Sequence, residues 1–174
     1  EIGPIANRPQ FERVAAMVDE GRKAGASVVC GGGRAPGHAR GFFYSPTVLA
    51  SLTPDMAVVR DEIFGPVLSV LEFDDEDEAV ALANGGTFDL AGAVWTRDVA
   101  RAHRMAAKVR AGSFWINGYR TLSVMTPFGG MHGSGYGRSS GSDAMLEYTQ
   151  AKSVWVETDD TSPQPFGYAP EGET

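Results

Sequence analysis

The stretch LAGAVWTRDVARAHRMAAKVRAGSFWIN, residues 90–117, decides the fold. It opens with an apolar run of strand length, residues 90–96, and closes with another, residues 113–117. Between the two runs, Asp98 is placed to cap a helix that continues to Arg110, with apolar side chains recurring on one face. Two strands joined by a helix of this length are typical of a crossover connection, which lays the strands parallel to each other.

The same alternation continues toward the N-terminus. Residues 67–73 are nearly continuous in apolar and β-branched side chains, as in a strand that is covered on both faces. The acidic run 74–78 then leads into an apolar-periodic stretch that ends at Gly85 and Gly86. Acidic residues favour the first turn of a helix because they lie at the positive end of its dipole. The sequence therefore predicts an α/β fold, a mainly parallel sheet with crossover helices.

The first fifty residues predict a helix and two further strands. The helix is expected over residues 9–24 and is followed by a short strand over residues 27–30. A second strand is expected over residues 42–49, bent or at an edge because Pro46 cannot donate to a ladder.

The C-terminal part predicts a long glycine-rich loop, a terminal strand over residues 153–157 and a tail without periodicity. The tail is rich in proline, glycine and acidic residues, which is typical of an extended or disordered arm. We expect three parts: a main unit (1–150), a terminal strand segment (151–157) and the tail (158–174).

Composition and charge exclude several classes of function. The net charge of −7 argues against a broad nucleic-acid contact, because the phosphate backbone would repel the protein. No apolar run approaches the ~20 residues that a membrane helix needs. The chain opens with Glu1 and without a signal-peptide pattern, so we expect a cytoplasmic location, and the opening resembles a cut more than a natural start.

The residues that most often carry chemistry give no catalytic or metal site by themselves. Cys30 is the only cysteine, and it ends an apolar strand without a cationic neighbour, so a structural role is expected. The three histidines, at positions 38, 103 and 132, have no metal-ligand spacing. We therefore predict no metal site.

The segment DEIFGPV, residues 61–67, is the first candidate for binding. Glu62 alone could be a solvated loop carboxylate, but Phe64 and a Gly-Pro pair follow it directly. A carboxylate beside an aromatic ring on a fixed backbone suits a sugar diol that carries a planar ring.

The loop NGYRTLSVMTPFGGMHGSGYGR, residues 117–138, is the second candidate. It is longer than ordinary connections, and its apolar residues, Leu122 and Phe128 among them, argue against a solvated linker. Its glycines do not make a dinucleotide-binding fingerprint, because no crossover unit surrounds them in the required order.

Several motifs together resemble the aldehyde dehydrogenase superfamily over about residues 1–157. The motifs are GPI (3–5), EIFGPV (62–67), FWIN (114–117), PFGG (127–130), SGYGR (134–138) and YTQAKSV (148–154). The resemblance implies the C-terminal part of the catalytic domain of an NAD(P)-dependent enzyme that oxidises an aldehyde to a carboxylic acid.

The resemblance also implies roles for individual residues. Glu62 would bind the nicotinamide ribose hydroxyls of NAD or NADP, and Phe64 would lie against the nicotinamide side of the cofactor. Leu122 and Phe128 would line the aldehyde pocket, and residues 153–157 would pair with a neighbouring subunit of a homo-oligomer.

The resemblance implies in addition that the cysteine nucleophile and the general-base glutamate lie outside this chain, which alone is expected to be inactive. Many members read Gly-Arg-Glu where this chain has Gly137-Arg138-Ser139, and a frequent lysine is replaced by His132. The alternative is a truncated, non-enzymatic protein that only folds and oligomerises. A separate nucleotide-binding module is poorly supported, because no phosphate-binding loop is present.

Overall fold

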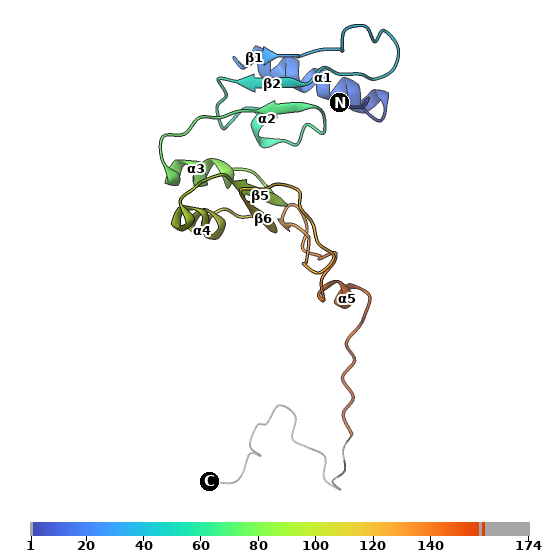
Figure 1. Ribbon diagram of the computed structural model, residues 1–174. Helices are drawn as coiled ribbons and strands as arrows, with labels where there is room; N and C mark the ends of the chain where they lie inside the picture. The colour runs from blue at the N-terminus through green and yellow to red at the C-terminus, as the bar shows by residue number, and fades with distance from the viewer. Residues whose placement is uncertain (1, 157, 159–174) are drawn as a thin grey trace, which may run out of the picture.

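The computed structural model describes residues 2–156 and residue 158. Its elements in chain order are α1 (Arg8–Lys23), β1 (Ser27–Cys30), β2 (Thr47–Ala50), α2 (Ala57–Arg60), β3 (Val67–Ser69), α3 (Glu76–Ala83), β4 (Phe88–Asp89), β5 (Ala91–Val94), α4 (Val99–Lys108), β6 (Ser113–Ile116), β7 (Met131–His132) and α5 (Ala144–Glu147). We call residues 2–70 the first region and residues 71–148 the second region. Figure 1 shows them as successive bodies, followed by a narrow segment that leads toward the C-terminal end.

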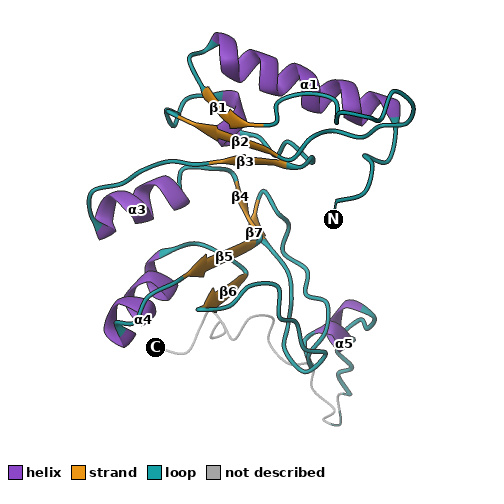
Figure 2. Cartoon of the chain, turned by 45° about the horizontal axis from the view of Figure 1, so that its top comes forward, coloured by secondary structure: helices purple, strands orange, loops and turns teal. Residues whose placement is uncertain are grey.

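The first region is a three-stranded sheet, in the order β1-β2-β3, with α1 packed along it (Figure 2). The side chain of Asn7 caps α1 by accepting a hydrogen bond from the amide of Gln10 at 2.9 Å. Val14, Val18 and Leu49 are fully buried between the helix and the sheet. Four further residues complete this core: Met17, Tyr44, Val58 and Ile63.

The second region contains the predicted strand–helix–strand unit. Strands β5 and β6 pair in parallel, with Ala91 opposite Ser113, and α4 connects them. As expected, Asp98 caps α4 by accepting a hydrogen bond from the amide of Arg101 at 3.1 Å. The acidic first turn of α3 is also confirmed, and Asp75 in addition caps this helix by accepting from the amide of Glu78 at 2.8 Å.

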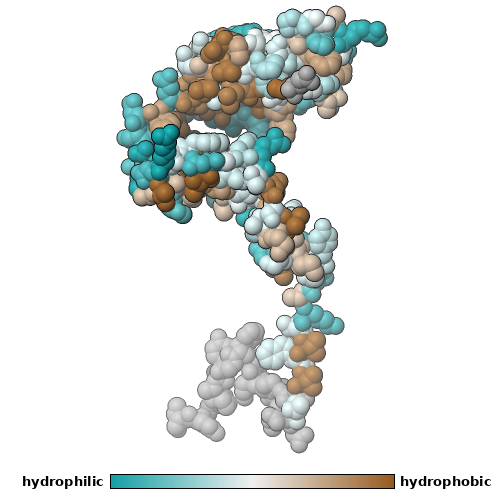
Figure 3. All heavy atoms as spheres, in the orientation of Figure 1, coloured by the Kyte–Doolittle hydropathy of each residue, from teal (hydrophilic) through white to brown (hydrophobic). Residues whose placement is uncertain are grey.

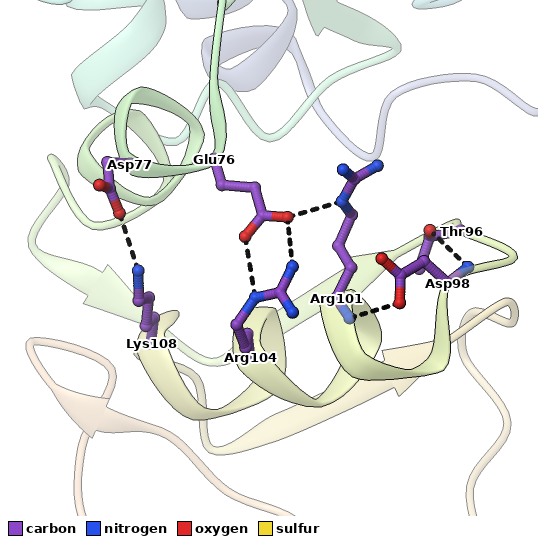
Figure 4. Close-up of polar contacts among 7 residues, drawn as sticks. All are labelled: Glu76, Asp77, Thr96, Asp98, Arg101, Arg104 and Lys108. Atoms are coloured by element: carbon purple, nitrogen blue, oxygen red, sulfur yellow. Dashed lines mark hydrogen bonds and ion pairs between the residues drawn. The ribbon is translucent and has the colours of Figure 1, made fainter.

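Polar contacts hold α3 against α4 (Figure 4). Glu76 contacts Arg101 at 2.6 Å and Arg104 at 2.7 Å, and Asp77 contacts Lys108 at 2.7 Å. Hydrogen bonds from Arg104, and secondarily from Arg101, lower the pKa of the Glu76 carboxyl from 4.5 to about 2. The acidic run that favours the start of a helix therefore also binds the neighbouring helix.

The α/β class is confirmed, but the expected mainly parallel sheet is divided. The described strands form three sheets, in which β2-β3 and β5-β6 are parallel whereas β1-β2 and β4-β7 are antiparallel. The strand expected over residues 67–73 pairs only over its first three residues. Its last bond to β2 runs from the amide of Val70 to the carbonyl of Leu49, because β2 ends at Ala50.

Within this chain the terminal segment makes no ladder over the part of residues 153–157 that the structure describes, 153–156. Its side chains are exposed, with Trp155 at 93% and Val154 at 73%. Figure 3 shows apolar side chains at the surface of both regions and on this narrow segment. Glu157 and all of the predicted tail except Thr158 lie outside the described residues. None of the described helices is long and apolar enough to cross a bilayer.

Candidate functional site

The segment 61–67 connects α2 to β3, and two side chains of α1 fix its backbone. Gln10 donates from Nε2 to the carbonyl of Ile63 at 2.9 Å and to that of Phe64 at 3.0 Å. Arg13 donates from its guanidinium to the carbonyls of Ile63 at 3.0 Å and Glu62 at 2.8 Å. Three successive carbonyl groups are therefore held by one face of a helix that lies about fifty residues earlier in the chain.

Close packing against the core of the first region also fixes the segment 61–67. Ile63 is buried in the core of the first region, and the carbonyl of Pro66 accepts from the amide of Thr47 at 2.8 Å. Gly65 lies against Val14, and a Cβ at this glycine would come within 2.6 Å of a Val14 methyl group. Any larger residue at position 65 would push the segment away from α1.

These contacts leave Glu62 and Phe64 facing outward. Both line a surface hollow of about 300 Å³, and Phe64 also borders a second hollow formed with residues 2–7. Phe64 has a left-handed backbone, φ 53°, and its side chain is 71% exposed. Within the described part of the chain, the Glu62 carboxylate accepts no hydrogen bond. An available carboxylate beside an exposed ring can bind a diol and cover a planar group at once.

Leu122 and Phe128 come together in another hollow, of about 250 Å³. Its opposite wall is Gly112 and the first three residues of β6, 113–115. The indole N–H of Trp115 donates to the carbonyl of Thr121 at 2.8 Å, which holds the Leu122 side of the loop against β6. The expected pairs are thus each brought together, Glu62 with Phe64 and Leu122 with Phe128, but in separate hollows.

Hydrogen bonds within the loop 117–138 and with its continuation give it a defined shape. Phe128 and Ser139 exchange two backbone hydrogen bonds, each of 2.7 Å. The guanidinium of Arg138 donates to the carbonyls of Gly130 at 2.7 Å and Gly137 at 2.9 Å. The apolar character of the loop indicated a non-solvated segment; Phe128 is half-buried, whereas Leu122 is 61% exposed.

Cys30 and His38 line none of these hollows. Cys30 is exposed at the end of β1, and its Sγ lies 3.8 Å from the carbonyl oxygen of Pro46. His38 stacks on Phe43 with a ring-centre distance of 4.3 Å. Over residues 2–156 and 158, no group of three or more His, Cys, Asp or Glu side chains could hold a metal ion.

Sequence reasoning missed the residues that fix the backbone of segment 61–67. Gln10 and Arg13 lie three residues apart on one helix face, which is a recognisable spacing, but nothing in the sequence indicates their carbonyl partners. The contact between Asp89 and His132 was missed as well, because the two residues are 43 positions apart.

Comparison with known proteins gives a consistent result. A sequence model described as "Aldehyde dehydrogenase family" matches residues 1–154. A betaine aldehyde dehydrogenase of Brucella anthropi is 46% identical over 159 residues, which cover 90% of this chain and 33% of that protein. The chain therefore spans about a third of the length of the curated relatives that it matches.

Solved structures agree with the sequence relatives. An NAD+ complex of an aldehyde dehydrogenase from Bacillus cereus is 44% identical, with a TM-score of 0.86, and the match covers 91% of this chain and 32% of that chain. A Mycobacterium tuberculosis aldehyde dehydrogenase complexed with NAD+ is 40% identical, with a TM-score of 0.85 and coverage of 93% and 33%.

Proposed function

The chain belongs to the aldehyde dehydrogenase family, and from this premise we propose that it forms part of an NAD(P)-dependent enzyme that oxidises an aldehyde to a carboxylic acid. The observation that carries the proposal is the outward-facing pair Glu62 and Phe64 on a backbone that Gln10 and Arg13 fix. Binding a flexible cofactor in one orientation requires such a preorganised surface.

The residues present fit the nicotinamide end of a dinucleotide. The two oxygens of the Glu62 carboxylate can accept from both hydroxyls of a ribose, and Phe64 offers an exposed ring to the adjoining planar base. The cofactor, when bound, supplies the hydride acceptor. NAD is favoured over NADP because the similar structures from Bacillus cereus and Mycobacterium tuberculosis are described as NAD+ complexes.

Leu122 and Phe128 are proposed to line the aldehyde pocket. Both border one hollow whose opposite wall includes the aromatic residues Phe114 and Trp115 of β6, and these side chains suit the carbon chain of an aldehyde. Betaine aldehyde is one substrate to test first, since it appears in the names of the relatives. The nucleophile is proposed to lie outside this chain, so that residues 1–174 alone are inactive.

Association with a second copy is proposed through residues 153–157. Val154 and Trp155 are largely exposed, and their backbone makes no ladder within this chain over the described residues. An extended segment of this kind can add a strand to another sheet. The same exposure favours the second candidate function, a non-enzymatic protein that folds and oligomerises. A cytoplasmic location remains part of the proposal.

The proposal is tested with Glu62→Gln in the complete enzyme. A charge-assisted hydrogen bond is worth about 1.5–3 kcal/mol, so the Kd of the dinucleotide should rise about 10- to 100-fold. Single-turnover hydride transfer should slow more than aldehyde binding weakens. Glu72→Gln is the matched control, because Glu72 is exposed and lines neither hollow.

Two results would count against the proposal. Unchanged dinucleotide affinity and hydride transfer in Glu62→Gln would remove Glu62 from the cofactor site. Reduced dinucleotide formed steadily by residues 1–174 alone would show that the chain does not depend on an external nucleophile. If that activity disappeared in Cys30→Ala, Cys30 itself would be the nucleophile.

A further inference from the structure

Asp89 carries a buried carboxylate and lines none of the three hollows described above. Its side chain is 2% exposed, and it lies on β4. One carboxylate oxygen, Oδ2, lies 2.6 Å from Nδ1 of His132 and 3.7 Å from Nε of Arg110. Burying a carboxylate is costly unless it is paired, and removing one partner leaves a charge with reduced compensation. Contact with His132 therefore strongly constrains where both residues can lie.

The backbone of Asp89 joins two other segments. Its amide donates to Oγ of Ser134 at 3.0 Å, in the turn that follows β7. Its carbonyl accepts from the amide of Gly112 at 3.0 Å, immediately before β6. A single residue of β4 thus connects the start of β6 with the turn after β7.

The first of these segments lines the hollow that contains Leu122 and Phe128, and the second follows the opposite wall, residues 126–128, a few residues later in the chain. Gly112 belongs to the β6 wall, and it lies so close beneath Gly129 that a Cβ on Gly112 would overlap the Gly129 carbonyl. Gly129 is bonded to Phe128, and His132 follows three residues later. The contact between His132 and Asp89 therefore determines the distance between Phe128 and β6 across the hollow.

We propose that Asp89 and His132 are positioning residues that fix the width of this hollow, and so the affinity for the aldehyde. The proposal rests on the proposed function, which assigns the hollow to the aldehyde. Because the carboxylate can only accept, the 2.6 Å contact requires a proton on Nδ1 of His132, which donates to Asp89. Neither residue touches the reacting atoms; both act through Phe128.

The kinetic test uses His132→Leu in the complete enzyme, which removes the donor. The KM of the aldehyde should rise about tenfold, while kcat and the KM of NAD stay within about twofold, because only the pocket wall is displaced. His132→Lys should restore most of the aldehyde affinity, since an ammonium group can also donate to Asp89. His103→Leu, at an exposed histidine of α4, is the matched control and should change nothing.

Hydrogen exchange gives a second measurement that does not need turnover. In His132→Leu the amides of Gly112, Phe128 and Ser139 should exchange faster, whereas those of Val14 and Val18 in α1 should not. If His132→Leu fails to fold, Asp89→Asn decides the matter, because it keeps the shape and removes the charge. It should raise the aldehyde KM by a smaller factor, because the asparagine oxygen can still accept from His132 but the charge that strengthens the contact is gone.

The proposal is overturned if the aldehyde KM is unchanged in both variants. It is also overturned if the KM of the aldehyde and the KM of NAD both rise while kcat falls, and His132→Lys restores none of the three values. That pattern indicates a purely structural role. If the unsubstituted enzyme oxidises no aldehyde, the proposed function fails, and exchange at Gly112 and Phe128 still shows whether His132 holds the two walls.

Discussion

In the first region, Val14, Val18 and Leu49 are fully buried between one helix and one sheet. In the described second region, Ala102 is the one buried apolar side chain, and the elements are joined by short backbone ladders, ion pairs and side-chain hydrogen bonds. The first region thus has a core of its own, in which each side chain supports several others. The second region is held by separate directional contacts, so the loss of one should leave most of the others intact.

The largest effect should come from breaking the core of the first region. Leu49→Ala removes a fully buried side chain and leaves a cavity, so the free energy of unfolding should fall by about 2–5 kcal/mol. Leu146→Ala in the second region is the control, because this leucine is 71% exposed and should matter little. Urea unfolding followed by circular dichroism measures both. Equal decreases in the free energy of unfolding in the two variants would contradict the proposed difference between the two regions.

A smaller effect is expected at Asn84, which joins the end of α3 to the end of α4. Its side chain accepts from the amide of Arg110 at 2.8 Å and donates to the carbonyl of Lys108 at 3.0 Å. Asn84→Ala should cost about 1 kcal/mol per lost bond in unfolding free energy. Asn84→Asp keeps the acceptor and loses the donor, so its loss should be smaller. An effect as large as that of Leu49→Ala would show a cooperative core in the second region too.

The smallest effect should be the pH dependence that Glu76 contributes. Its pKa is about 2 when folded and 4.5 as the ordinary value, so its stabilising contribution is present above pH 4.5 and is lost as the pH falls toward 2. Glu76→Gln should therefore flatten the stability profile in that window. The difference should shrink at 1 M salt, where the screening length is about 3 Å. If the free energy of unfolding depends on pH in the same way in Glu76→Gln, the ion pairs of Glu76 do not contribute to stability.

How well the sequence predicted each element depended on whether its signals were local. The helix expected over residues 9–24 is α1, Arg8–Lys23, and the strand expected over 27–30 is β1. Caps such as Asp98 and periodic apolar positions act within a few residues, so they are visible in the sequence. The strand that begins at Val67 was expected to continue to residue 73. It is shorter in the structure because its length depends on where its partner β2 ends. Such limits are set by partners far away in the chain.

The candidate residues were predictable by resemblance, and their roles remain predictions. Their supports were not predictable, because Gln10 and Arg13 act through backbone carbonyls whose position no side-chain pattern records. The pair β4-β7, with Asp89 on one strand and His132 on the other, has only two residues on each side. Strands of two residues are too short to show the alternation of apolar and polar side chains by which a strand is predicted from sequence.

The contacts of Gln10 and Arg13 also bear on protein engineering. The segment EIFGP is contiguous, and it could be mistaken for a motif that can be moved into another scaffold by itself. Its carbonyl groups depend on donors that lie 49 to 54 residues upstream. A successful transplant would have to include α1 at the same spacing, and a library that randomises α1 must keep positions 10 and 13 constant. The transferable module is discontinuous: a helix face and a turn that must be moved as one unit.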